Sequence, residues 1–131
     1  MRVVLDASAC VEFLLGTALG ARVAASLVAA ESIHAPELLV SEVISALRGL
    51  VRGGVATEAE ARLALRDLGR LDVDLVSALA LAPAIWARSS GHSSYDAHYV
   101  ALAAALPATL LTTDAKLAAA ASGVGVELVS G

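Results

Sequence analysis

The stretch Arg2-Val3-Val4-Leu5-Asp6 is a short apolar run that ends at a carboxylate. A continuous run of this kind is typical of a strand buried on both faces in a parallel sheet. A second run, Leu110-Leu111-Thr112-Thr113, ends in the same way at Asp114. In open parallel sheets the site lies outside the carboxyl ends of the strands, near the point where the strand order reverses. Both aspartates are therefore expected at one edge of one sheet.

Strands and helices are predicted to alternate along the rest of the chain. Apolar runs predict strands over residues 3–5, 32–35, 73–76, 109–112 and 126–129. Helical patterns predict helices over residues 9–15, 19–29, 37–51, 57–68, 78–88, 94–106 and 115–121. Ser8 is predicted to cap the first helix, Thr57 and Glu60 form a capping box, and Pro83 predicts a helix start or a kink. This alternation indicates an open parallel sheet with helices on both faces.

Composition indicates a single domain spanning residues 1–131, with a core of small aliphatic residues. Apolar residues make up 58% of the chain and aromatic residues 3%, and the net charge is −4. No basic tail or stripe is present, so contacts with nucleic acid must come from individual Arg and Lys side chains. The single cysteine, Cys10, excludes an internal disulfide and fits a small buried hydrophobe. The N-terminal sequence does not resemble a signal peptide, and we expect a cytoplasmic location.

A membrane-spanning role is not expected. The longest stretch without Asp, Glu, Lys or Arg runs from residue 97 to residue 113, and Pro107 interrupts it. A spanning helix needs roughly 18 or more consecutive apolar residues. A helix followed by a short buried strand explains this stretch better.

Two further acids lie on predicted helices and face the protein body. Glu42 lies at the edge of an apolar helix stripe, and Asp96 shares its helix face with Val100 and Ala103. With Asp6 and Asp114 they form a set of four carboxylates that can converge on one crevice. Such a cluster cannot stay ionised without a cation, and Mg²⁺ and Mn²⁺ are the hard ions that prefer oxygen ligands.

Each of these acids also has an ordinary structural explanation when it is taken alone. Asp6 and Asp114 can cap the segments that follow them, and Asp96 suits a helix N-terminus. Glu42 can pair with a neighbouring arginine. Taken together, the four positions favour a common site over four separate coincidences.

Several motifs, in this order along the chain, resemble those of PIN-domain proteins. They are Val3-Val4-Leu5-Asp6-Ala7-Ser8, Glu42 inside a long helix, Tyr95-Asp96-Ala97-His98-Tyr99-Val100-Ala101-Leu102-Ala103, and Leu110-Leu111-Thr112-Thr113-Asp114. Within that family the chain is most similar to the VapC-type toxins of toxin–antitoxin pairs. The resemblance covers essentially the whole chain. It implies an α/β fold of three layers, α/β/α, with a short, mainly parallel sheet.

The resemblance also implies a metal-dependent endoribonuclease. Its metal ligands and catalytic residues would be Asp6, Glu42, Asp96 and Asp114, which hold Mg²⁺ or Mn²⁺. Ser8 and Thr112 match hydroxyl positions that line the family's site. The chain departs from many relatives at Ala104, where they carry another acid, and from some relatives just after Asp114, where it has Ala115 and Lys116.

Hydrolysis of a phosphodiester builds negative charge on the phosphate oxygens, which one or two divalent ions can neutralise. Arg48, Arg52 and Lys116 are candidates for contacts with RNA phosphates, although each can equally be an ordinary solvated cation. His92 and His98 lie close to Asp96 in sequence, but a loop position and a different helix face make them poor ligand candidates.

Two other functions remain open at this point. One is a phosphotransfer enzyme with Asp6 as nucleophile; a haloacid-dehalogenase-type site needs a second aspartate where this chain has Ser8, and receiver-type acids are also missing. The other is a catalytically weak PIN-like domain that binds RNA or protein.

Partners are expected to cover apolar helix surfaces. The stretches 14–28 and 38–51 are rich in apolar residues for a domain of this size. We expect a homodimer, and a cognate antitoxin protein whose helix or tail fills an apolar groove. The sequence does not identify the RNA that is cleaved.

Overall fold

The computed structural model describes all 131 residues and contains one five-stranded sheet in which every neighbouring pair is parallel. The strand order is β3-β2-β1-β4-β5. The strands are β1 (Arg2–Leu5), β2 (Ser32–Pro36), β3 (Asp74–Val76), β4 (Thr109–Thr112) and β5 (Val126–Leu128). The α/β class with a parallel sheet is thus confirmed, and no antiparallel pair is present.

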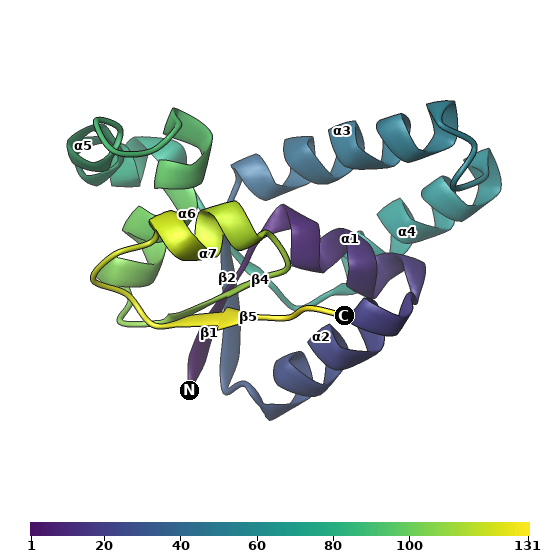
Figure 1. Ribbon diagram of the computed structural model, residues 1–131, viewed down its shortest axis with the longest axis horizontal. Helices are drawn as coiled ribbons and strands as arrows, with labels where there is room; N and C mark the ends of the chain where they lie inside the picture. The colour runs from purple at the N-terminus through teal and green to yellow at the C-terminus, as the bar shows by residue number, and fades with distance from the viewer.

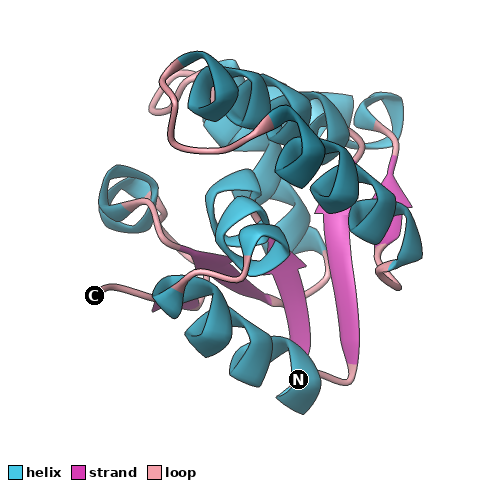
Figure 2. Ribbon diagram, turned by 90° about the vertical axis from the view of Figure 1, so that its right-hand side faces the viewer, coloured by secondary structure: helices cyan, strands magenta, loops and turns pink.

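Seven helices connect the strands and cover the sheet (Figures 1 and 2). They are α1 (Ala7–Leu15), α2 (Ala18–Ala29), α3 (Leu38–Arg52), α4 (Glu58–Arg70), α5 (Ala78–Arg88), α6 (Ser94–Ala105) and α7 (Ala115–Ala120). In Figure 1, α5 and α6 lie to the left of the strands, and α1, α3 and α4 lie to the right. The result is the expected three-layer arrangement.

The strand order reverses at the centre of the sheet. From β1 the chain moves outward through β2 to β3, and it then returns to pair β4 against the other side of β1. The pairing aligns Val4 with Leu110 and Leu5 with Leu111. The residues that follow β1 and β4, Asp6 and Asp114, therefore stand side by side at the reversal point, where open parallel sheets place their sites.

The core consists of aliphatic side chains from the central strands and the helices packed on them. The side chains of β1 and β4 are fully buried at Val3, Val4, Leu5, Leu110 and Leu111. Cys10 is also fully buried, as expected, and burial followed by the nearby Asp6 charge raises the pKa of its thiol to about 12.

Close packing also fixes the corner between α1 and α2. A Cβ atom at Gly20 would lie 2.0 Å from the carbonyl oxygen of Glu12, so only glycine permits this approach. The two helices are bent by 109° at their junction.

The predicted cap of the first helix was wrong: α1 begins at Ala7, and its N-cap is Asp6 rather than Ser8. Helix α5 has the predicted bounds, Ala78–Arg88, with Pro83 in its interior. It begins at Ala78 rather than at Pro83, because Ser77 caps it by accepting a hydrogen bond from the Leu79 amide at 3.2 Å. The predicted capping box of Thr57 and Glu60 is present at the start of α4.

No single helix has the length and apolar character needed to cross a membrane, although the bent pair α1 and α2 passes that test jointly. The uncharged stretch from residue 97 to residue 113 forms most of α6 followed by β4, as expected from the sequence.

Candidate active site

One cavity of about 500 Å³ opens at the carboxyl edge of the central strands. All four carboxylates singled out in the sequence line it, and each comes from a different part of the fold. Asp6 follows β1, Glu42 lies on α3, Asp96 lies on α6 and Asp114 follows β4. The fold therefore gathers residues spaced over more than a hundred positions into one cavity.

Asp6 is the most buried of the four, with 4% of its surface exposed. Its carboxylate accepts hydrogen bonds from the Thr112 hydroxyl at 2.7 Å, the Ser8 hydroxyl at 2.8 Å and the Ala9 amide at 2.9 Å. Burial raises the pKa of Asp6; these hydrogen bonds oppose the rise, and the charge of Asp114 adds to it. The two hydroxyls thus hold a carboxylate that is costly to ionise.

Ser8 and Thr112 also tie the two strand ends together. The Ser8 hydroxyl accepts a hydrogen bond from the Thr113 amide at 3.1 Å. The Thr112 hydroxyl accepts one from the Asp114 amide at 2.9 Å. Because each hydroxyl contacts Asp6 and the segment after β4, the two residues fix the position of Asp6 relative to Asp114.

Glu42 is held by Tyr99, which approaches from the opposite helix. The Tyr99 hydroxyl donates to Glu42 Oε1 at 2.6 Å. Burial, followed by this hydrogen bond, raises the pKa of Tyr99, so the hydroxyl keeps its proton and remains a donor. Glu42 takes part in none of the protein's ion pairs, so pairing with an arginine does not explain its position.

The last two acids differ in how strongly the protein holds them. Asp114 caps α7, with Oδ1 accepting from the Lys116 amide at 2.9 Å and the Leu117 amide at 3.3 Å. Asp96 lies in the first turn of α6, half-buried, and its carboxylate makes no hydrogen bond within the protein. Asp96 is therefore the acid of the set with both oxygens free.

The donor set suits a hard divalent cation. Five carboxylates line the cavity, the four named above and Glu12, and no Lys, Arg or His forms an ion pair with any of them. As the side chains stand, no three of the acids are close enough to enclose one ion. Asp6, Glu42 and Asp114 each accept hydrogen bonds from the protein in this arrangement. The chemistry of the site nevertheless fits Mg²⁺ or Mn²⁺, since these ions prefer oxygen ligands and would neutralise the cluster.

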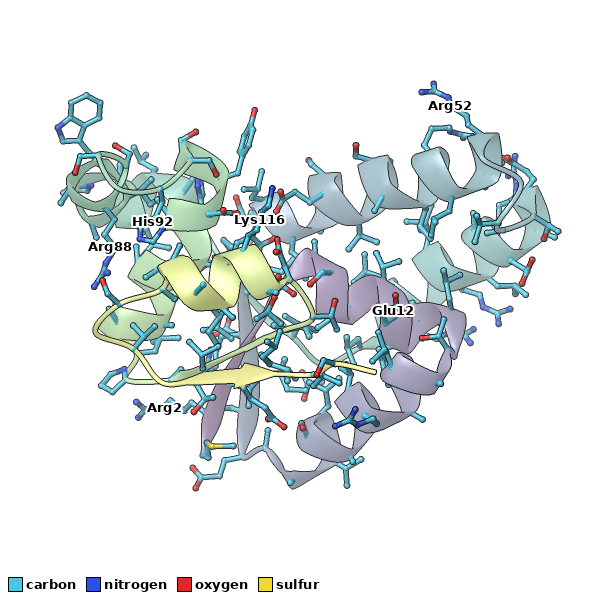
Figure 3. The ribbon with its side chains drawn as sticks, in the orientation of Figure 1. Arg2, Glu12, Arg52, Arg88, His92 and Lys116 are labelled. Carbon is cyan, nitrogen blue, oxygen red and sulfur yellow. The ribbon has the colours of Figure 1, made fainter.

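The three candidate phosphate-binding cations lie in different surroundings. Arg48 forms an ion pair with Glu58 at 3.2 Å, which ties α3 to α4. Arg52 lies ten residues after Glu42, roughly 15 Å farther along the helix, and Figure 3 shows it at the distant end of α3. Lys116 is exposed, two residues after Asp114. Of the three, only Lys116 adjoins a cavity residue.

Tyr99 and Glu12 are among the cavity-lining residues that sequence reasoning did not single out. Tyr99 lies three residues after Asp96 and so on the same face of α6, a spacing that could have identified it. Glu12 lies six residues after Asp6 on α1, where its carboxylate accepts a hydrogen bond from the Thr17 hydroxyl (Figure 3). His92 and His98 do not line the cavity.

Comparison with known proteins identifies relatives over most of the chain. The sequence model of the PIN domain matches residues 3–123. VapC ribonuclease Mb0985 of Mycobacterium bovis is 40% identical over 115 residues, which are 88% of this chain and 87% of that protein. The crystal structure of PAE2754 from Pyrobaculum aerophilum matches with a TM-score of 0.69 at 22% identity, covering 96% of this chain and 83% of that one. The crystal structure of VapBC2 from Rickettsia felis, bound to a DNA fragment from its promoter, matches with a TM-score of 0.67 at 13% identity. The match covers 99% of this chain and 100% of that one.

The family match and the identity to a curated relative agree with the fold and with the motifs at Asp6, Asp96 and Asp114. This chain therefore belongs to the PIN-domain family, in the branch of the VapC ribonucleases.

Proposed function

We propose that this protein is a metal-dependent endoribonuclease and the toxin component of a toxin–antitoxin pair. The observation that carries the proposal is that Asp6, Glu42, Asp96 and Asp114 converge on one cavity. No basic side chain forms an ion pair with any of them. The ribonuclease names of relatives at 36–41% identity support an RNA substrate. An RNA substrate in turn agrees with action in the cytoplasm.

The four acids would hold Mg²⁺ or Mn²⁺ and act as the catalytic residues. Bound there, the cation would neutralise charge on the phosphate oxygens and lower the pKa of an attacking water. Ser8 and Thr112 donate hydrogen bonds to the Asp6 carboxylate, which favours its ionised form and opposes the effect of burial on its pKa. Tyr99 keeps Glu42 turned in one direction, since its hydroxyl donates to a single carboxylate oxygen.

Contacts with phosphates outside the cavity are proposed for the cations predicted from the sequence. Lys116 is the best placed, because it is exposed and lies two residues after Asp114, the acid that follows β4. Arg48 and Arg52 lie along α3, so they could contact RNA only at a distance from the reacting phosphate.

The activity proposal is tested by RNA cleavage with the purified, partner-free protein. We expect cleavage of single-stranded RNA in Mg²⁺ or Mn²⁺, and its loss when EDTA is added, because the carboxylates alone cannot neutralise a phosphate. Restoring excess Mn²⁺ after EDTA should restore cleavage. Cleavage that persists undiminished in EDTA would contradict a metal-dependent mechanism.

A cognate antitoxin and a homodimer are proposed as partners. Exposed apolar side chains support this, notably Val28 on α2, Ile44 on α3 and Leu79 on α5, with 87%, 48% and 85% of their surfaces exposed. A further solved structure with this fold, VapBC-5 from Mycobacterium tuberculosis, is a member of the VapBC family of toxin–antitoxin systems, which agrees with a protein partner for this chain. We expect a dimer by light scattering and co-purification with the product of an adjacent small gene. A monodisperse monomer that recovers no such partner would contradict both proposals.

A further inference from the structure

A second, smaller cavity of about 270 Å³ adjoins the carboxylate cavity. It is lined by Leu38, Ser41, Glu42, Ser45 and Tyr95. Glu42 and Ser45 line both cavities, so the two lie next to each other along α3. A substrate whose phosphate lies among the acids can therefore reach into the smaller cavity with the adjoining part of the same molecule.

The side chains of this second cavity are available for a ligand. Tyr95 is 60% exposed, although it directly precedes the buried face of α6, and its hydroxyl makes no hydrogen bond within the protein. Ser41 and Ser45 are exposed one turn apart on α3, and their hydroxyls are also without protein partners. Leu38 is half-buried and provides an apolar wall. An aromatic ring, an apolar wall and free hydroxyls are the groups that bind a heterocyclic base.

We propose that Tyr95, Ser41 and Ser45 form a base-binding subsite for a nucleotide that flanks the scissile phosphate. This inference rests on the proposed ribonuclease function. Tyr95 would stack on the base, and the two serine hydroxyls would hydrogen-bond its edge. Because stacking requires a base that is free of pairing, the subsite selects single-stranded RNA or a loop.

The position of the subsite beside the carboxylate cavity favours a nucleic-acid base over a protein side chain as its ligand. The subsite adjoins a cavity lined by carboxylates, where a metal-bound phosphate belongs, and Tyr95 is adjacent in sequence to Asp96. Base stacking on an aromatic side chain contributes enough that its removal by alanine weakens binding roughly 5- to 150-fold.

The test compares Tyr95→Ala, Tyr95→Phe and Trp86→Ala. Trp86 is a matched control, because it is an exposed aromatic residue on α5 that lines neither cavity. With a short single-stranded RNA, Tyr95→Ala should raise KM roughly 5- to 150-fold and leave kcat within a few-fold. Tyr95→Phe, which keeps the ring, and Trp86→Ala should both stay close to the wild-type KM.

An abasic scan of the RNA then identifies stacking directly. In the wild type, an abasic nucleotide at one position next to the cleaved bond should raise KM by about the factor seen for Tyr95→Ala, and the same RNA should cause no further loss in that variant. Binding by fluorescence anisotropy, in the Asp96→Asn background, gives a second readout that does not depend on cleavage. If wild type cleaves RNA but Tyr95→Ala leaves KM and abasic sensitivity unchanged, the subsite is overturned while the nuclease stands. If Tyr95→Ala loses binding to a partner protein but keeps wild-type RNA kinetics, the base-binding subsite is likewise overturned. If neither the wild type nor any variant cleaves RNA, the proposed nuclease activity is refuted instead.

Discussion

Replacing Asp96 by asparagine is expected to abolish RNA cleavage while leaving the fold intact. Asp96 supplies a half-buried carboxylate to the cavity, and its side chain makes no hydrogen bond that asparagine would lose. Removing one preorganised electrostatic group at a reacting centre typically lowers kcat by roughly 10²–10³-fold. The measurement is initial-rate cleavage of a defined RNA in saturating Mn²⁺, with circular dichroism and thermal melting to verify the fold.

Asp72→Asn is the matched control for this substitution. Asp72 is an exposed aspartate in the connection between α4 and β3, outside the cavity and without an ion pair. The Asp72→Asn substitution removes one negative charge at a distance from the cavity, so cleavage should stay within about two-fold of the wild-type rate. Full activity in Asp96→Asn would refute the carboxylate mechanism.

Mg²⁺ or Mn²⁺ is expected to raise the melting temperature of the protein, because a cation that binds only the folded state stabilises that state. At a metal concentration of 100 times Kd the gain is about 2.7 kcal/mol, or roughly 10 °C for a chain of this length. A thermal melt series over Mn²⁺ concentration measures it. An unchanged melting temperature at saturating metal would show that the four acids do not form one site.

The metal-free protein should lose stability as pH rises through the acidic range. The pKa of Asp6 is raised above the 3.8 of the unfolded chain, so the folded protein retains a proton that the unfolded chain has already released. The contribution of Asp6 to stability is therefore fully present below about pH 4 and is lost as pH rises through the folded pKa. Melts across this range without metal measure the loss, and Mn²⁺ should reverse it at neutral pH.

The variant Asp114→Asn, compared with Asp72→Asn, separates repulsion between acids in the cavity from the effect of losing one negative charge elsewhere on the protein. Asparagine can still cap α7, whereas the loss of the Asp114 charge removes one cause of the raised pKa of Asp6. The variant should melt higher than wild type without metal and respond more weakly to Mn²⁺. Asp72→Asn should respond as wild type does. An Asp114→Asn response as strong as that of wild type would contradict the shared site.

Local signals predicted most of the elements of this fold. The apolar runs before Asp6 and Asp114 give the two central strands, because a strand buried on both faces must be continuously apolar. The pair Thr57 and Glu60 marks the start of α4 through hydrogen bonds only three residues apart. Such signals depend on neighbours in sequence, so they can be read without the tertiary structure.

Contacts between distant residues could not be predicted in the same way. Ser8 was expected to cap α1, but its hydroxyl contacts Thr113, 105 residues away, while Asp6 takes the cap. Tyr99 reaches Glu42 across 57 residues, and the sequence contains no local sign of that hydrogen bond. The four acids themselves could be selected because strand ends and helix faces restrict where their side chains lie. Their hydrogen-bond partners depend instead on where the fold places α3 relative to α6, and on the pairing of β1 with β4.

The pairing of β1 with β4 has a consequence for the synthesis of the protein. Asp6 leaves the ribosome 108 residues before Asp114 does. At about 5–20 residues per second, translation of the segment between them takes roughly 5–20 s. Throughout that time the nascent chain lacks the strand that completes the centre of the sheet and the acid that follows it. A chain that stops before Thr109 therefore lacks β4 and Asp114, so it cannot assemble the cavity with its full acid set.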